Sequence, residues 1–235
     1  MHTARRRAPW HKGEGPVKLY TFWRSLATYR VRVALRLKGV AVETVNVDLL
    51  QGDQHRGDYL DVNPQKVIPA LVLDDGGLPL FQSMAILEYL EEVYPNPPLL
   101  PADARGRARV RGLSQIVVSD SHPLSVPRVR NFLTQRFNFD ETQLNTWIAH
   151  WQTEALRALE AHLSRDPATG RYCHGDSLTL ADICLASQAV AAGFFKLDLA
   201  PYPTVARIAA ACFAPDAFAR EHPLRQPGAP ATLAH

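Results

Sequence analysis

The chain has few cysteines and no long apolar run, and each shortage excludes a class of protein. Its three cysteines, Cys173, Cys184 and Cys212, follow neither CxxC nor zinc-ligand spacing, so we expect reduced, packed thiols rather than disulfides or structural zinc. No run of about eighteen apolar residues and no charged-then-apolar leader are present, which argues against membrane insertion and secretion. A phosphate-binding glycine loop is also missing. We therefore expect a cytoplasmic protein with no metal site and no membrane partner.

The composition suits a globular enzyme, and its net charge comes from one end. The chain has 235 residues, 46% of them hydrophobic and 21% charged, which is enough for one large or two modest cores. Residues 1–16 hold four of the 26 basic residues and one of the 23 acidic ones, so the remainder is neutral. A nucleic-acid or membrane arm is one interpretation of this segment. Because it has no apolar period and ends in Gly-Glu-Gly-Pro, we predict a disordered extension with neither partner.

Residues 17–96 have the pattern of an α/β domain. Alternating and helical periods follow one another as strand, helix, strand, then strand, strand, helix. Gly39 is a suitable stop for the first helix, and Asp74-Asp75-Gly76-Gly77 predicts a hairpin. The expected strands are 17–21, 42–48, a segment ending near 73, and 78–81, and the expected helices are 27–38 and 83–94, with a loop and short helix over 51–59.

Residues 103–226 have helical periods and no strand signal. Pro95-Asn96-Pro97-Pro98 marks the expected boundary between this domain and the first. Thr179-Leu180-Ala181-Asp182 is a capping box in its acidic form, and we expect it to begin a buried core helix. The expected helices are 103–121, 126–138, 142–165, 180–192, 203–212 and 216–221.

Ser25 lies where the first strand passes into the first helix. The first turn of a helix leaves N–H groups unpaired and carries the positive end of the macrodipole, so a thiol bound there ionises more easily than in water. The Ser25 hydroxyl could donate to such a sulfur. A simple N-cap is the alternative role.

Two further segments of this domain suit a peptide-like anion. Ile68-Pro69 precedes a strand that we predict to be a sheet edge, and a cis bond there would turn the Ile68 backbone toward a ligand's main chain. A trans proline in a plain turn is the alternative. Gln82-Ser83 begins the next helix, where a hydroxyl and free N–H groups suit a carboxylate, although Ser83 could also be only a cap.

Taken in order, these segments resemble the zeta class of the glutathione transferase superfamily, of the maleylacetoacetate or maleylpyruvate isomerase type. The most specific match is Arg24-Ser25 followed by Tyr29-Arg30-Val31-Arg32-Val33-Ala34-Leu35. The supporting segments are 60–71, 82–92, 99–101, 179–182 and 198–203. The resemblance implies a thioredoxin-like N-terminal domain with a mixed β-sheet that binds glutathione, an all-helical C-terminal domain that contributes the substrate side, and a homodimer.

The resemblance also implies roles for single residues. Ser25 matches the serine that activates the glutathione sulfur, and Ile68 matches the backbone partner of the cysteinyl unit, with Pro69 as its cis-proline. Gln82 and Ser83 match the anchors of the γ-glutamyl end. The weaker matches are Gln54 toward the glycyl end, His122 near the mouth of the site, and Arg24 and Arg128 as cations for the substrate carboxylate.

Three departures from the family pattern keep several functions open. Leu26 stands where a second serine is usual, Ala27 where many members have cysteine, and Phe194 where relatives often have an arginine for the substrate carboxylate. The leading hypothesis is glutathione-dependent cis–trans isomerisation of a maleyl-type diketo acid in aromatic or tyrosine catabolism. The alternatives are a general glutathione transferase or dehalogenase for small electrophilic acids, which Phe194 favours slightly, and a non-catalytic binding protein of the same fold.

Overall fold

The computed structural model describes residues 17–230, which fall into two compact units. The first unit takes the chain to Pro97 and resumes at Glu221, and the second is Pro98–Arg220. The predicted disordered extension, residues 1–16, lies outside the described residues. The sequence-based prediction carried the helical domain to residue 226, whereas the second compact unit ends at Arg220, six residues earlier.

The first unit contains a four-stranded mixed sheet with the order β2-β1-β3-β4. β1 runs parallel to β2 and antiparallel to β3, and β4 is antiparallel to β3. This confirms the thioredoxin-like fold that was expected for this part of the chain. The strands are β1 (Lys18–Thr21), β2 (Glu43–Asn46), β3 (Ala70–Val72) and β4 (Leu80–Phe81).

The prediction that the strand after Ile68-Pro69 is a sheet edge is wrong. β3 lies inside the sheet, between β1 and β4. The hairpin at Asp74-Asp75-Gly76-Gly77, with Gly76 at a φ of +75°, returns the chain so that β4 covers the outer side of β3. Among the described strands the edges are therefore β2 and β4, and the backbone available near Pro69 is the segment before β3.

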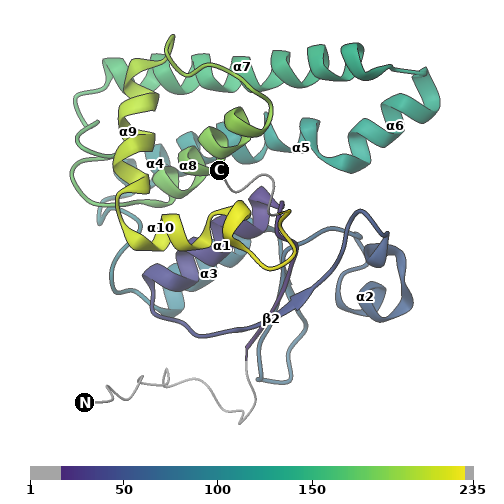
Figure 1. Ribbon diagram of the computed structural model, residues 1–235. Coiled ribbons are helices and arrows are strands. Elements are labelled where there is room, and N and C mark those ends of the chain that lie inside the picture. Colours follow the sequence, from purple (N-terminus) through teal and green to yellow (C-terminus); the bar gives the residue numbers. More distant parts are fainter. Residues whose placement is uncertain (1–16, 231–235) are drawn as a thin grey trace. The chain divides into compact units, whose positions relative to one another are not determined.

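Helices cover both faces of this sheet. α1 (Leu26–Leu37) and α3 (Ser83–Val93) pack on one face, while η1 (Asp53–His55) and α2 (Gly57–Val62) lie on the other (Figure 1). α1 is followed by Gly39, whose φ of +67° suits the left-handed stop that the sequence predicted. A buried ion pair joins the C-terminal end of α1 to α3, with Lys38 Nζ 2.6 Å from Glu91 Oε2. Together these helices bury the apolar face of the sheet.

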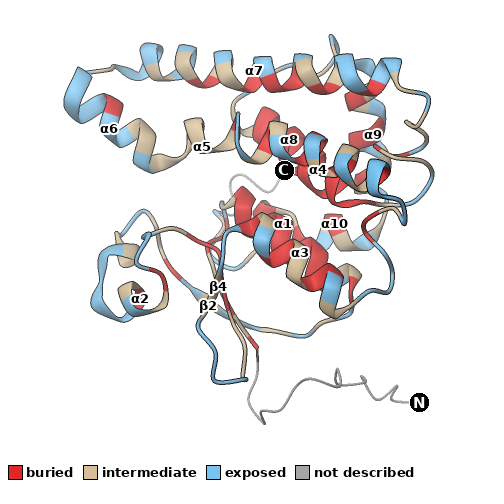
Figure 2. Cartoon of the chain, turned by 180° about the vertical axis from the view of Figure 1, so that it is seen from behind, coloured by how far each residue is buried: buried red, intermediate tan, exposed pale blue. Residues whose placement is uncertain are grey.

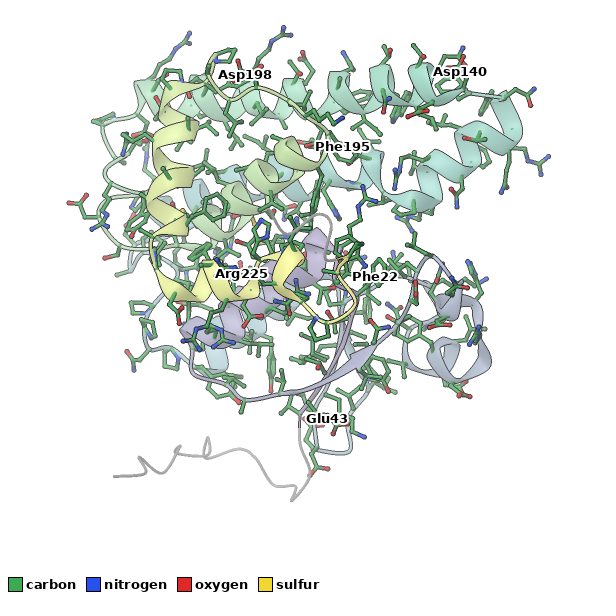
Figure 3. All side chains as sticks on the ribbon, in the orientation of Figure 1. Phe22, Glu43, Asp140, Phe195, Asp198 and Arg225 are labelled. Carbon is green, nitrogen blue, oxygen red and sulfur yellow. The ribbon has the colours of Figure 1, made fainter. Side chains whose placement is uncertain are left out.

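The strand pairing brings one end of each of the four strands to the same end of the sheet. Tyr20 pairs with Ala70, and Ala70 pairs with Phe81, so the end of β1, the start of β3 and the end of β4 lie side by side. β2 is parallel to β1 and therefore ends there too. Figure 3 labels Phe22 at this end and Glu43 at the opposite one. Residues distant in sequence can therefore form one site here.

The second unit is helical, and α8 (Leu180–Phe194) forms its core. α8 packs against α4 and α9, and 13 of its 15 residues, Leu180 to Ala192, are buried (Figure 2). A helix that is apolar on all sides belongs in an interior. No helix among the described residues combines the length and the apolar character needed to cross a membrane. The other helices are α4 (Ala104–Val118), α5 (His122–Ser125), α6 (Pro127–Phe137), α7 (Glu141–Arg165), α9 (Pro203–Phe213) and α10 (Asp216–Glu221).

The capping box predicted for α8 is present and buried. Asp182 Oδ2 accepts from the backbone N–H of Thr179 at 2.8 Å and from its hydroxyl at 2.7 Å, and Oδ1 accepts from the N–H of Cys173 at 2.7 Å. All three cysteines are free and buried, as predicted. Because burial raises the pKa of the Cys173 and Cys212 thiols, these side chains act as small apolar groups rather than nucleophiles.

The return of the chain to the first unit depends on Glu221. Its carboxylate lies 2.5 Å from a terminal nitrogen of Arg36 and 3.5 Å from Nε of Arg32, both on α1. Its carbonyl oxygen accepts from Arg32 at 3.2 Å. Burial lowers the pKa of Arg32 to about 10, an effect that the Glu221 carboxylate opposes, so Arg32 stays charged at neutral pH. The short helix η2 (Pro223–Arg225) follows.

His222 makes the stability of this segment depend on pH. Burial, with the charges of Arg225 and Arg32, lowers the pKa of His222 below its ordinary 6.5, and its Nδ1 accepts from the N–H of Leu224 at 3.2 Å. The unfolded chain binds this proton more readily than the folded one. The stabilisation is therefore complete above about pH 6.5 and is lost as the pH falls below it.

We expect acidification below about pH 6.5 to lower the thermal unfolding midpoint less in His222→Asn than in the unmodified chain. Asparagine keeps an acceptor at the N-cap but does not titrate. Thermal unfolding of both proteins across this pH range measures the difference. If the unfolding midpoints of the two proteins fall in parallel with pH, His222 is not the source of the pH dependence.

Candidate functional site

Ser25 caps α1. It has extended backbone geometry, its carbonyl accepts from Tyr29 N at 2.9 Å, and its Oγ accepts from Thr28 N at 3.1 Å. The N-cap interpretation of this serine is therefore confirmed. Capping does not exclude a role for Ser25 in binding an anion such as a thiolate. Ser25 is half-buried and stands at the first turn, where backbone N–H groups point out of the helix. The junction can stabilise a bound anion.

The segment before β3 presents its backbone at the same end of the sheet. The Ile68-Pro69 bond is cis. Val67 is held on its carbonyl oxygen by the Tyr59 hydroxyl at 2.6 Å and by Asn63 Nδ2 at 2.7 Å. Neither the N–H nor the C=O of Ile68 has a hydrogen-bond partner within residues 17–230. A firmly held segment with free polar groups can pair with the main chain of a peptide.

Gln82 and Ser83 start α3 beside this segment. Gln82 has an unusual φ of +67°, and its Nε2 donates to Gln65 Oε1 at 2.8 Å. Ser83 is buried and its Oγ accepts from Nε of Arg30 at 3.2 Å. The Arg30 guanidinium is itself 1% exposed. A helix N-terminus with a buried arginine behind its first hydroxyl is a favourable position for a carboxylate.

Gln54 and Arg24 lie on loops at the same end. Gln54 is in η1, after β2, and its Oε1 is enclosed without a hydrogen-bond donor among the described residues. An unpaired buried acceptor costs about 1–3 kcal/mol, so this amide is suited to an incoming N–H. Arg24 is exposed immediately before Ser25. The strand pairing thus brings to one end of the sheet the strand ends next to Arg24, Ser25, Ile68, Gln82 and Ser83, and Gln54 follows the strand β2 that ends there too.

The remaining predicted residues belong to the second unit. His122 is the half-buried first residue of α5, and Arg128 is exposed near the start of α6. Phe194 is half-buried at the end of α8. No group of three or more His, Cys, Asp and Glu side chains within the described range could hold a metal ion.

The segment that carries His122 is supported by a buried polar network that the sequence did not indicate. Gln188 Nε2 donates to Gln152 Oε1 at 2.8 Å, Gln152 Nε2 donates to Ser125 Oγ at 3.0 Å, and Ser125 Oγ donates to the carbonyl oxygen of His122 at 3.2 Å. Buried chains of this kind fix one conformation when each member is paired. The orientation of the α5 turn is therefore well determined within its unit.

Comparisons with known proteins agree on one family. The model for the glutathione S-transferase N-terminal domain matches residues 15–92. A maleylpyruvate isomerase of Ralstonia sp is 46% identical over 90% of this chain and 99% of its own length. A maleylacetoacetate isomerase of Pseudomonas aeruginosa is 45% identical over 92% of this chain and all of its own.

Solved structures give the same result. A maleylacetoacetate isomerase of Methylobacterium extorquens AM1 with bound malonate and glutathione has a TM-score of 0.89 and 50% identity, covering 91% of this chain and 100% of that one. A holo maleyl pyruvate isomerase, a bacterial glutathione S-transferase of the zeta class, has a TM-score of 0.87 and 46% identity with the same coverage. The similarity extends over both units.

Proposed function

The chain belongs to the zeta-class glutathione S-transferase family, and from this premise we propose that it is a glutathione-dependent cis–trans isomerase of a maleyl-type diketo acid, either maleylacetoacetate or maleylpyruvate. The observation that carries the proposal is the convergence of Ser25, the Ile68 backbone and Ser83 at one end of the sheet. This end offers a hydroxyl, free main-chain groups and a helix N-terminus. We place the reaction in aromatic-ring or tyrosine catabolism, in the cytoplasm.

The residues of the first unit fit glutathione in its extended form. In this proposal Ser25 faces the sulfur, and Ile68, ahead of the cis Pro69, pairs with the cysteinyl main chain. Gln82 and Ser83 hold the γ-glutamyl carboxylate, with the charge of Arg30 behind them. Gln54 Oε1, which is enclosed, accepts a hydrogen bond from the N–H of the glycyl unit. Each group has the donor or acceptor character that its partner requires.

The chemistry needs a thiolate and fixed positive charge. Bound glutathione supplies a thiolate that adds reversibly to the cis double bond conjugated to the ketone, so that rotation about the resulting single bond precedes departure of the sulfur. Ser25 and the first turn of α1 stabilise the negative sulfur. Arg24 and Arg128 are proposed to bind the carboxylate of the substrate, and His122 to lie near the mouth of the site. The active assembly is proposed to be a homodimer.

A second candidate is glutathione transfer to a small electrophilic acid, or its dehalogenation. Phe194 favours it, because an apolar ring stands where relatives often have an arginine. Loss of a buried cation would weaken a charged clamp by a few kcal/mol, about the range measured when a buried charge loses its partner.

Assays with maleylacetoacetate and with maleylpyruvate, with and without glutathione, test the proposal. We expect an ultraviolet absorbance change that requires glutathione and returns it unconsumed. Conjugation of a haloacid without isomerisation of either diketo acid would replace the first function by the second. Binding of glutathione with no turnover of any of these acids would leave a non-catalytic binding protein.

A further inference from the structure

The family resemblance singled out Ser25 but not the side chain that contacts it most closely. Thr28, one turn along α1, is fully buried at 0% exposure. Its backbone N–H lies 3.1 Å from Ser25 Oγ, and its hydroxyl donates to the same oxygen at 2.9 Å. Ser25 Oγ thus accepts two hydrogen bonds from Thr28, one from its backbone and one from its side chain.

We propose that Thr28 is a positioning residue that orients the Ser25 hydroxyl toward the bound sulfur, an inference that rests on the proposed function. A serine hydroxyl has two acceptor positions and one proton to donate. Thr28 fills both acceptor positions, with its N–H and its O–H. The Ser25 proton is then directed away from the helix, where a ligand at the first turn can accept it.

The geometry differs from the usual behaviour of a helical threonine. Such a hydroxyl normally bonds a backbone carbonyl three or four residues earlier, whereas Thr28 bonds the side-chain oxygen of the N-cap. Its β-branched side chain is restricted at χ1, so the contact costs little additional rotamer freedom. The neighbours Leu26 and Ala27 contribute no hydroxyl, and Thr28 therefore takes a supporting role in this turn.

Donation from Thr28 also strengthens the hydrogen bond that Ser25 gives. When a hydroxyl accepts a hydrogen bond, its own proton becomes a better donor, because successive hydrogen bonds polarise one another. The effect is larger in a site shielded from water, and Thr28 is shielded. Thr28 should thus lower the pKa of the bound thiol without contacting it.

The test compares Thr28→Val, which keeps the shape and removes the hydroxyl, with Thr28→Ser, which keeps the hydroxyl. For each protein the pKa of bound glutathione is read from the ultraviolet absorbance of the thiolate during a pH titration, and kcat and KM are measured at neutral pH. We expect Thr28→Val to raise the thiol pKa and to lower kcat about tenfold, with KM for glutathione within about twofold, since one hydrogen bond to an anion is weakened. Thr28→Ser should have the thiol pKa and the kcat of the unmodified protein.

Several outcomes would overturn the proposal. If Thr28→Val has the thiol pKa and kcat of the unmodified protein, or if Thr28→Ser is as impaired as Thr28→Val, the hydroxyl does not position Ser25. Thr28→Ala is measured as well, so that poor folding of the valine variant does not decide the result. If the unmodified protein neither lowers the thiol pKa nor turns over any of the acids, the proposed function fails, and the role of Thr28 fails with it. If the unmodified protein is active and only the variants behave unexpectedly, the proposed function survives alone.

Discussion

Ser25→Ala is expected to lower kcat by about 100-fold or more, while KM for glutathione changes little. This is the usual size of the loss when one preorganised donor to a developing or resident negative charge is removed. The tripeptide would keep the contacts proposed for it with Ile68, Gln82 and Ser83, so binding should persist. Steady-state kinetics with saturating glutathione, together with direct titration of glutathione binding, separates the two effects.

The same substitution also removes an N-cap, and this needs its own control. Loss of a cap costs about 1 kcal/mol of stability. Asp140→Ala is a matched control, because Asp140 caps α7 with a hydrogen bond from Gln143 N at 2.8 Å and is exposed (Figure 3 labels this residue). It should lose similar stability and keep full activity. Full activity of Ser25→Ala would exclude Ser25 from the chemistry, whereas equal inactivity of both variants would attribute the loss to stability.

Asp182→Ala is expected to destabilise the second unit by about 3 kcal/mol or more, because three buried donors lose their hydrogen bonds to one carboxylate. The substitution leaves the N–H of Cys173 and the N–H and hydroxyl of Thr179 without their acceptor inside the protein. Each orphaned group costs about 1–3 kcal/mol. Denaturant unfolding followed by far-ultraviolet circular dichroism measures the change.

Asp182→Asn and Asp140→Ala show whether burial is the cause. Asparagine retains one acceptor oxygen and should lose less stability than alanine. Asp140→Ala affects a capping box of the same type on the surface and should cost about 1 kcal/mol. An Asp182→Ala loss as small as that of Asp140→Ala would contradict the argument.

Periodicity predicted the elements of this fold well because most of them have one apolar face. The predicted long helices begin and end within a few residues of their observed positions, and 216–221 agrees with α10 at both ends, whereas the short helices α5 and η2 were not predicted. Capping residues explain this agreement, since Ser25 and the Thr179–Asp182 box have the hydrogen bonds that the sequence implied. Strand position was harder. β3 has three residues, and so short a run does not reveal whether it has one neighbour or two.

Most of the candidate site was found through recognised segments, and its supporting residues were not. Ser25 and Ser83 follow the ends of β1 and β4, Ile68 precedes β3, and the family resemblance indicated all three. Thr28 and Arg30 support the site by donating hydrogen bonds to Ser25 and Ser83. These contacts depend on side-chain geometry, which the spacing of residues in the sequence does not reveal. A hydroxyl three residues after the capping serine was the available signal for Thr28. The segment 60–71 supported the family resemblance, but its sequence did not indicate the hydrogen bond from Asn63 to Val67.

The path of the chain has a consequence for synthesis in the cell. Arg32 and Arg36 are synthesised long before Glu221, the carboxylate that compensates them, since Glu221 lies 185 residues after Arg36. These ion pairs of the first unit can therefore form only after the whole second unit has been synthesised. An expression fragment that stops at Pro97 would contain all the predicted glutathione-binding residues except His122, yet it would leave two arginines on α1 without their counter-ion.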